Sequence, residues 1–344
     1  MSPATYLRPT AAAVAILAVL SGCSGGSSSG AGPTITLYNA QHEQTTNALI
    51  AAFTAQTGIR VRVDSNSEDV LTAQIEQEGS RSPADVVYTE NSNWLQQLDG
   101  KSLLAPVDPA TLANVPTVDS AANGDWVGVS ARVSALVYNP NKISAAQLPT
   151  SVLGLADPKW KGKIEIAPAE TDFWPVVSSV VRAYGQTAAL SWLNGLKANA
   201  GSNDNIPDNE TLVSDVNKGV TSMALINYYY YFRLQAEIGT AAVKAKLAFL
   251  RPGDPGFVED VSGAAILKSS KHPAAAQQFL AFLTGSAGQT ALTRSDSFEY
   301  PIHPGVAANS VLTPFDQVHP APFTPTDLGT GLDAKMLLQE AGLL

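Results

Sequence analysis

Between Thr34 and Glu90 the sequence alternates between strand-like and helix-like segments, and this alternation limits the chain to few folds. Three short segments have the pattern of strands, namely Thr34–Tyr38, Ile59–Val63 and Asp85–Tyr88. The two stretches between them place apolar residues on one helical face, and the second runs from about Glu68 to Glu78. Strand, helix, strand, helix, strand is typical of a parallel sheet covered by helices, so we predict an α/β fold.

Two polar side chains follow strands of this predicted sheet at matched positions. His42 comes after the first strand, and Glu90 comes directly after the third. Sheets of this kind bind ligands just beyond the carboxyl ends of their strands. A single loop histidine is more often a simple hydrogen-bonding residue, and a glutamate after a strand is more often a helix cap. Together the two residues form a candidate binding site.

A long apolar segment indicates that the chain forms two lobes. The length of 344 residues suits two globular units better than one small core. Trp126–Tyr138 is rich in β-branched residues, as expected of a strand that passes from one lobe to the other. The chain is expected to cross back at about Glu259, because Val261–Leu267 again has the pattern of a strand. This organisation assigns residues 33–131 plus 260–310 to the first lobe and 132–259 plus 311–344 to the second.

The charge and the motif content argue against several classes of protein. The net charge is −9 without a block of like charge, which disfavours nucleic acid as a partner. The sequence contains no H-E-x-x-H motif and a single cysteine, and the G-x-S-x-G spacing occurs only in the low-complexity stretch 22–30. We therefore expect a binding protein and not an enzyme.

The N-terminal segment has the order of features of a bacterial lipoprotein signal. Arg8 precedes the apolar run Ala11–Leu20, which is too short to span a membrane as a helix. The run leads into Leu20-Ser-Gly-Cys23, which resembles a lipobox, so 1–22 is predicted to be a signal peptide and Cys23 the lipidated residue. Residues 23–32 are then predicted to form a flexible tether. The alternative is a plain secretory signal with an incidental cysteine.

Four of the ten tyrosines form one run, Tyr228–Tyr231, behind the apolar segment Met223–Ile226. A run of this kind is usually aromatic packing. A phenol has a pKa near ~10, but a bound cation of high charge deprotonates it and makes it a hard anionic oxygen ligand. Whether these tyrosines bind a metal therefore depends on which other side chains converge on them.

Several segments together resemble the periplasmic ferric iron-binding proteins of bacterial ABC transporters, a family with a two-lobed type II solute-binding fold. The resemblance runs from about Thr34 to the C-terminus. Its motifs are Tyr38–His42, Pro83–Glu90, Lys159–Lys163, Ala224–Tyr230, Ser262–Ala265 and Glu299–Pro301. It implies two lobes, each a mixed and mostly parallel sheet flanked by helices, with chain crossovers at Ser130–Val133 and Glu259–Val261.

In that family a histidine, a glutamate and two adjacent tyrosines bind one Fe(III), and an exogenous anion completes the coordination. The matching residues are His42, Glu90, Tyr229 and Tyr230, while Tyr228 falls on an asparagine of the family pattern. The chemistry agrees, because two phenolates and one carboxylate balance the charge of Fe(III), and a neutral imidazole adds none. Two positions of an octahedron remain open for carbonate, phosphate or water.

The anion site departs from the family pattern. A Ser-Gly-Ala turn that holds phosphate in the family aligns here with Glu170-Thr171-Asp172. Two carboxylates repel phosphate, so we expect phosphate to be weak or absent, with Asp172, Glu170, carbonate or water in its place; alternatively, Asp172 caps the following helix. Asn209 and Asn227 match the anion-contacting asparagines of the family, and Arg294 is a further candidate for positive charge near the anion.

The resemblance implies a monomeric extracytoplasmic lipoprotein at the outer face of the cytoplasmic membrane. It would capture a ferric ion or a small ferric chelate and deliver it to the permease of an ABC importer. The main alternative is a protein of the same fold that binds a sugar, a polyamine or a phosphonate.

Overall fold

The computed structural model describes Gly32–Leu344. The predicted signal peptide, Cys23 and nearly all of the tether lie outside the described residues. Within the described range no helix combines the length and the apolar character that a membrane crossing requires.

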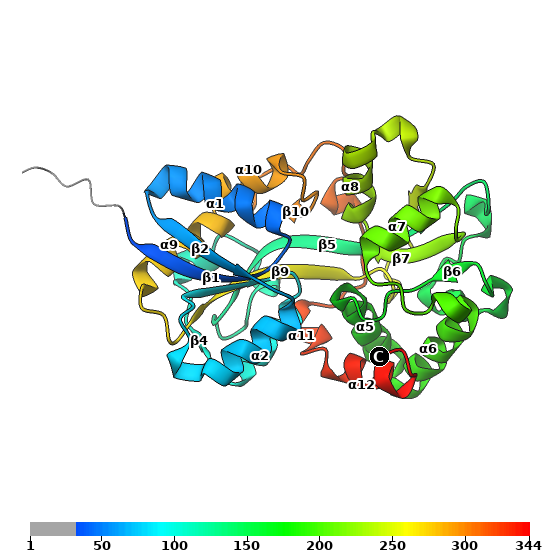
Figure 1. Ribbon diagram of the computed structural model, residues 1–344, viewed down its shortest axis with the longest axis horizontal. Coiled ribbons are helices and arrows are strands. Elements are labelled where there is room, and N and C mark those ends of the chain that lie inside the picture. The colour runs from blue at the N-terminus through cyan, green and yellow to red at the C-terminus, as the bar shows by residue number, and fades with distance from the viewer. Residues whose placement is uncertain (1–31) are drawn as a thin grey trace, which may run out of the picture. The chain divides into compact units, whose positions relative to one another are not determined.

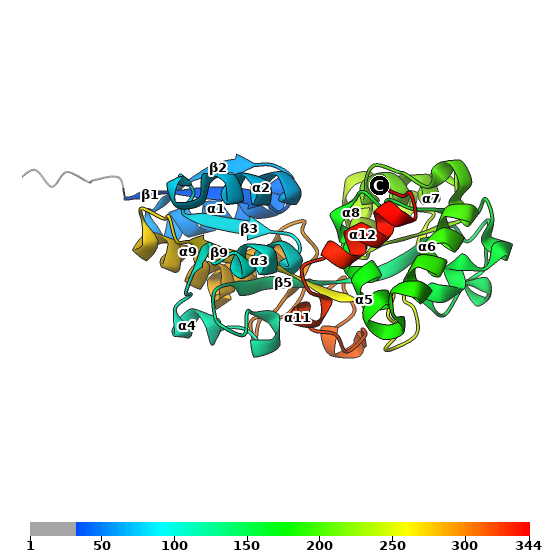
Figure 2. The same cartoon turned by 90° about the horizontal axis from the view of Figure 1, so that it is seen from below.

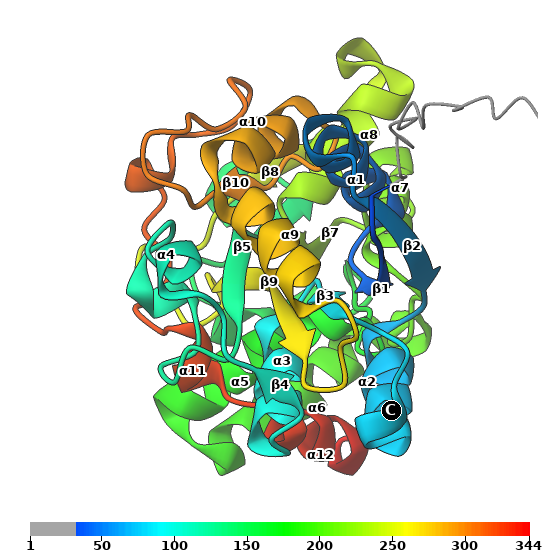
Figure 3. The same cartoon turned by 90° about the vertical axis from the view of Figure 1, so that its left-hand side faces the viewer.

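The first three strands and their helices confirm the predicted alternation. β1 lies between β2 and β3 and pairs in parallel with both, while α1 and α2 are the connections. In Figure 3, α1, α9 and α10 lie on one side of these strands, and α2 and α3 lie on the other. The elements are β1 (Thr34–Ala40), α1 (Glu43–Thr57), β2 (Arg60–Ser65), α2 (Glu68–Glu78), β3 (Val86–Thr89), α3 (Ser92–Gly100), β4 (Leu104–Ala105), α4 (Pro109–Leu112), α9 (Pro273–Thr284), α10 (Ser286–Arg294) and β10 (Tyr300–Pro301).

The second group of elements surrounds the strand that precedes the tyrosine run. β7 pairs in parallel with β6 and antiparallel with β5 (Val127–Tyr138). Helix α12 packs against α5 and α6, and α11 packs against α3 and α5. The elements are β6 (Ile164–Glu165), α5 (Trp174–Tyr184), α6 (Gln186–Ala200), α7 (Asn209–Lys218), β7 (Met223–Asn227), α8 (Tyr229–Ile238), β8 (Lys246–Ala248), α11 (Pro325–Leu328) and α12 (Leu332–Glu340).

Two long antiparallel strands join the two groups. β5 (Val127–Tyr138) pairs with β9 (Glu259–Leu267) up to Val133 and with β7 from Ser134 onward. Every residue of β5 is buried, which explains its apolar and β-branched sequence. Figures 1 and 2 show β5 and β9 running from the lobe that holds β1–β3 into the lobe that holds β6–β8. We call these the first and the second lobe.

Asp85 joins β1 to the loop that follows β9. One of its carboxylate oxygens accepts hydrogen bonds from the Ser270 hydroxyl at 2.7 Å and from the His272 backbone N–H at 3.0 Å. The other accepts from the backbone N–H of Thr36 at 2.8 Å and lies 3.2 Å from Nδ1 of His272. Burial opposes ionisation of Asp85, but the hydrogen bonds from Ser270, Thr36 and His272 outweigh it and hold its pKa below the usual value.

We expect the substitution Asp85→Asn to lower the free energy of unfolding by about 2–3 kcal/mol at neutral pH, because an amide cannot accept this many hydrogen bonds. A carboxyl with a depressed folded pKa stabilises the protein above its unfolded pKa, near ~4, and loses that effect as the pH falls through the folded pKa. Urea unfolding should therefore show a difference at pH ~7 that shrinks below pH ~4. The exposed Asp64→Asn variant is the matched control, and equal stability of parent and Asp85→Asn at neutral pH would contradict the prediction.

Candidate metal centre

His42 lies between the end of β1 and the start of α1, where local hydrogen bonds hold its backbone. The His42 N–H donates to Oε1 of Gln41 at 2.7 Å, and Nδ2 of Asn39 donates to the Gln41 carbonyl oxygen at 2.8 Å. The imidazole is 18% exposed, so it is directed inward without being sealed from solvent.

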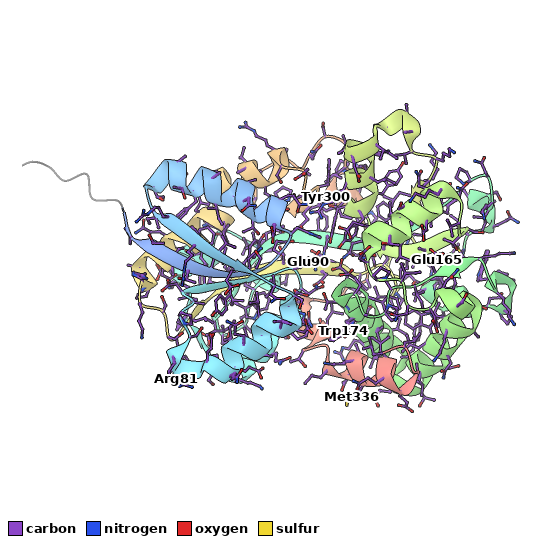
Figure 4. All side chains as sticks on the ribbon, viewed as in Figure 1. Arg81, Glu90, Glu165, Trp174, Tyr300 and Met336 are labelled. Carbon is purple, nitrogen blue, oxygen red and sulfur yellow. The ribbon has the colours of Figure 1, made fainter. Side chains whose placement is uncertain are left out.

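Glu90 follows β3, as predicted, and meets His42. The two strand ends are neighbours because Ala40 of β1 is in register with Thr89 of β3. Oε1 of Glu90 lies 3.0 Å from Nε2 of His42. Figure 4 shows Glu90 near the middle of the molecule, where the two lobes meet. Burial opposes charge on both groups, but each stabilises the other, so the pKa of His42 is raised and that of Glu90 is held below its usual value.

Tyr229 and Tyr230 reach the same point from the second lobe. They are the first residues of α8, directly behind β7, and their ring centroids lie 4.3 Å apart. The Tyr229 hydroxyl donates to Glu90 and lies 3.2 Å from Nε2 of His42. The Tyr230 hydroxyl lies 3.4 Å from the same nitrogen. The structure thus brings together the imidazole, the carboxylate and the two phenols that the resemblance implies.

Asp172 is a fifth member of this group. It lies in the short turn Thr171–Phe173 that precedes α5. Its Oδ2 accepts hydrogen bonds from Tyr230 at 3.0 Å, from Tyr229 at 3.2 Å and from Nδ2 of Asn209 at 3.3 Å. Asp172 does not cap the helix by a side-chain hydrogen bond, because its Oδ2 accepts only from these three side chains and its Oδ1 has no hydrogen-bond partner among the described residues. The hydroxyl and amide donors of the second lobe hold the carboxylate instead.

The other residues predicted near the anion lie close to Asp172 and make no hydrogen bond to the two phenols among the described residues. The Thr171 hydroxyl donates to Glu68 at 2.7 Å. Burial and the nearby Asp172 raise the pKa of Glu170 to about 9. Asn227 and Asp172 line a small cavity of about 10 Å³, roughly the space of one water molecule. The Nδ2 group of Asn227 and Oδ1 of Asp172 have no hydrogen-bond partner among the described residues.

Arg294 is not brought to this group. It is the exposed last residue of α10 and makes no ion pair within the described part of the chain. The positive charge comes from Arg233, whose guanidinium lies 4.8 Å from the ring centre of Tyr229 and 5.8 Å from that of Tyr230. Sequence reasoning missed Arg233, although its spacing of four and three residues from the tyrosines places it on their side of a helix.

Arg132 is a second cation that sequence reasoning missed. It is fully buried in β5, donates to Asn91 at 2.8 Å and to Asp260 at 3.0 Å, and lies 3.5 Å from Oδ1 of Asp172. A charged residue in the middle of an apolar strand was the available signal, since a buried charge requires a partner.

The phenols are neutral in the absence of a metal. Burial raises the pKa values of Tyr229 and Tyr230 well above the usual value, and the negative charges of Asp172 and Glu90 raise them further. Within residues 32–344 no cluster of three or more histidine, cysteine and carboxylate side chains is arranged to hold a metal. A metal at this point therefore requires the phenol oxygens, and an oxygen-rich donor set of this kind suits a hard, highly charged cation.

Comparisons with known proteins agree with this donor set. Residues 81–326 match the family model described as bacterial extracellular solute-binding protein. The chain is 38% identical over 310 residues to the Fe(3+)-binding periplasmic protein of Serratia marcescens, covering 90% of each protein. It is 39% identical over 311 residues to the major ferric iron-binding protein of Neisseria meningitidis, covering 90% of this chain and 93% of that one.

A solved structure extends the similarity to three dimensions. Iron-bound HitA from Pseudomonas aeruginosa is 42% identical and superimposes with a TM-score of 0.86, covering 90% of this chain and 99% of HitA. The match confirms the two-lobed α/β fold and the family resemblance noted in the sequence. The chain belongs to the bacterial extracellular solute-binding proteins and, within them, to the periplasmic ferric iron-binding family, whose members are binding proteins and not enzymes.

Proposed function

We propose that this chain captures Fe(III) through His42, Glu90, Tyr229 and Tyr230. One observation carries the proposal: two phenol oxygens and a carboxylate oxygen each lie within 3.4 Å of the imidazole Nε2. When Fe(III) is bound, the phenols lose their protons and supply hard anionic oxygens, and the imidazole coordinates in its neutral form. Relatives whose names describe ferric iron binding support the same cargo.

We further propose that the carboxylate of Asp172 takes the place of the exogenous anion. It contacts both phenol oxygens directly, so it is close enough to share a metal with them. With Asp172 included, the ligands carry one negative charge more than Fe(III) neutralises, and Arg132 and Arg233 lie beside them. The remaining coordination position is open to water or carbonate.

The ligands come from both lobes, which supports a hinged mode of capture. His42 and Glu90 belong to the first lobe, whereas Asp172, Tyr229 and Tyr230 belong to the second. We propose lobe boundaries at 131/132 and 259/260, with Ser130–Val133 and Glu259–Val261 as the hinge strands. A metal ion that is bound by ligands from both lobes stabilises the closed arrangement of the lobes.

The predicted leader and the family support a proposal for the cellular role. We propose that the chain is exported, lipidated at Cys23 and held at the outer face of the cytoplasmic membrane. There it acts as a monomer that passes ferric iron, free or as a small chelate, to the permease of an ABC importer. The solute-binding family match and the periplasmic relatives support this role.

A colour test separates ferric iron from the organic ligands that remain the alternative. Phenolate bound to Fe(III) absorbs visible light, so we expect the purified chain to turn red to pink on ferric loading and to bleach with citrate. It should also bleach on acidification, because protons compete with iron for the phenolates. A chain that stays colourless with excess ferric chelate, but binds a sugar, polyamine or phosphonate in calorimetry, would favour the alternative. The tight mutual contacts of the five side chains suit a single ion better than an extended organic molecule.

A further inference from the structure

Glu299 is a fully buried carboxylate that lies outside the proposed set of iron ligands. Its Oε2 accepts a hydrogen bond from the hydroxyl of Ser130 on β5. The Ser130 hydroxyl also lies 2.5 Å from that of Ser262 on β9, and both hydroxyls are fully buried. Glu299 is therefore hydrogen-bonded to β5 directly and is connected to β9 through the Ser130 hydroxyl.

The second carboxylate oxygen of Glu299 leads to the iron site. Nε2 of Gln41 donates to Oε1 of Glu299 at 3.3 Å, and Oε1 of Gln41 accepts from the backbone N–H of His42 at 2.7 Å. Gln41 is only 4% exposed, so water does not readily replace either hydrogen bond. This one amide therefore connects Glu299 to the backbone of the loop that holds the imidazole.

The residues on either side of Glu299 hold the tyrosine segment. The carbonyl oxygen of Phe298 accepts a hydrogen bond from the hydroxyl of Tyr228, which directly precedes Tyr229. Phe298 has φ 54°, a left-handed conformation that costs energy in a bulky residue and persists only where its surroundings hold it. Tyr300 packs on Tyr228 with ring centroids 5.1 Å apart and pairs with Ala131 of β5. The segment Phe298–Tyr300 thus contacts both the histidine side and the tyrosine side of the site.

We propose that Glu299 is a positioning residue for the ferric site: it holds His42, through Gln41, in register with the tyrosine pair and the hinge strands. This inference rests on the proposed capture of iron. Without the carboxylate, the amide of Gln41 and the hydroxyl of Ser130 lose their common buried acceptor. The loop that carries His42 is then free to move relative to the tyrosines. Mutation of a residue that orients a metal ligand typically lowers metal affinity by about 10- to 100-fold.

The test compares Glu299→Gln with a double variant in which the amide of Gln41 and the carboxylate of Glu299 change places. In Glu299→Gln one of the two acceptor oxygens becomes an NH₂ donor, so the side chain no longer accepts from both Gln41 and Ser130, and we expect citrate to remove iron at least about tenfold faster, with a shifted visible band. In the double variant Gln41→Glu/Glu299→Gln, a carboxylate at position 41 accepts from the new amide and from the His42 N–H. We expect this exchange to restore most of the parental retention and spectrum, which a merely structural loss would not do.

Glu165→Gln is the matched control, because Glu165 is equally buried but lies in the second lobe away from Glu90 (Figure 4). It should leave the visible band and the rate of iron removal unchanged. If Glu299→Gln does not fold, Gln41→Met removes the same link without introducing a second donor, and it should show the same faster loss. Parental spectra and rates in Glu299→Gln, or in Gln41→Met, would overturn the inference while leaving the iron function standing. A parent chain without a ferric band would overturn both.

Discussion

Tyr229→Phe and Tyr230→Phe should each strongly reduce and shift the visible band and weaken ferric binding by at least about 100-fold. Each substitution removes one anionic oxygen ligand and leaves the ring in place. The rings lie 4.3 Å apart and are buried, so their packing survives the loss of a hydroxyl. The unfolding midpoint of the iron-free protein should therefore change little, which separates lost coordination from lost folding. Visible titration with a ferric chelate and competition with citrate measure both effects.

Tyr231→Phe is the control from the same run. The Tyr231 hydroxyl accepts a hydrogen bond from Gln235 at 2.9 Å and makes no contact with the ligand group among the described residues. This variant should keep the parental colour and affinity. Full colour in both Tyr229→Phe and Tyr230→Phe would refute the assigned pair.

Asp172→Ser should make iron retention depend on phosphate. The substitution removes the carboxylate that contacts both phenols and leaves Asn209, Asn227 and the guanidinium of Arg132 around the vacated space. These groups attract an anion once the negative charge has gone. In phosphate-free buffer we expect citrate to remove iron at least about tenfold faster than from the parent, and added phosphate to reverse most of the difference.

The parent chain should be insensitive to phosphate under the same conditions. Glu170→Gln is the matched control, because Glu170 is a neighbouring carboxylate without a hydrogen bond to either phenol within residues 32–344. That variant should behave as the parent does. Equal phosphate dependence of parent and Asp172→Ser would show that Asp172 does not replace the anion.

Local sequence patterns were enough to predict the parallel sheet and the two strand ends that carry His42 and Glu90. Alternation along Thr34–Tyr88 indicated a parallel sheet, and the ends of parallel strands meet at one edge. The structure accordingly places His42 and Glu90 side by side at the ends of β1 and β3. The helical spacing that connects Arg233 to the tyrosines was equally local and could have replaced the prediction of Arg294.

Such patterns did not predict the hydrogen-bond partners of Asp172 and Glu299. By itself the sequence indicated which segments between Thr34 and Glu90 form strands and helices and that His42 and Glu90 follow strands, because these patterns depend on neighbours a few positions apart. Only the tertiary structure decided that Asp172 accepts from two phenols instead of capping its helix, and that Glu299 meets Gln41. The partners of these carboxylates lie 57, 58 and 258 residues away along the chain. A buried carboxylate takes the donors that the folded chain brings within about 3 Å, and no local spacing encodes that choice.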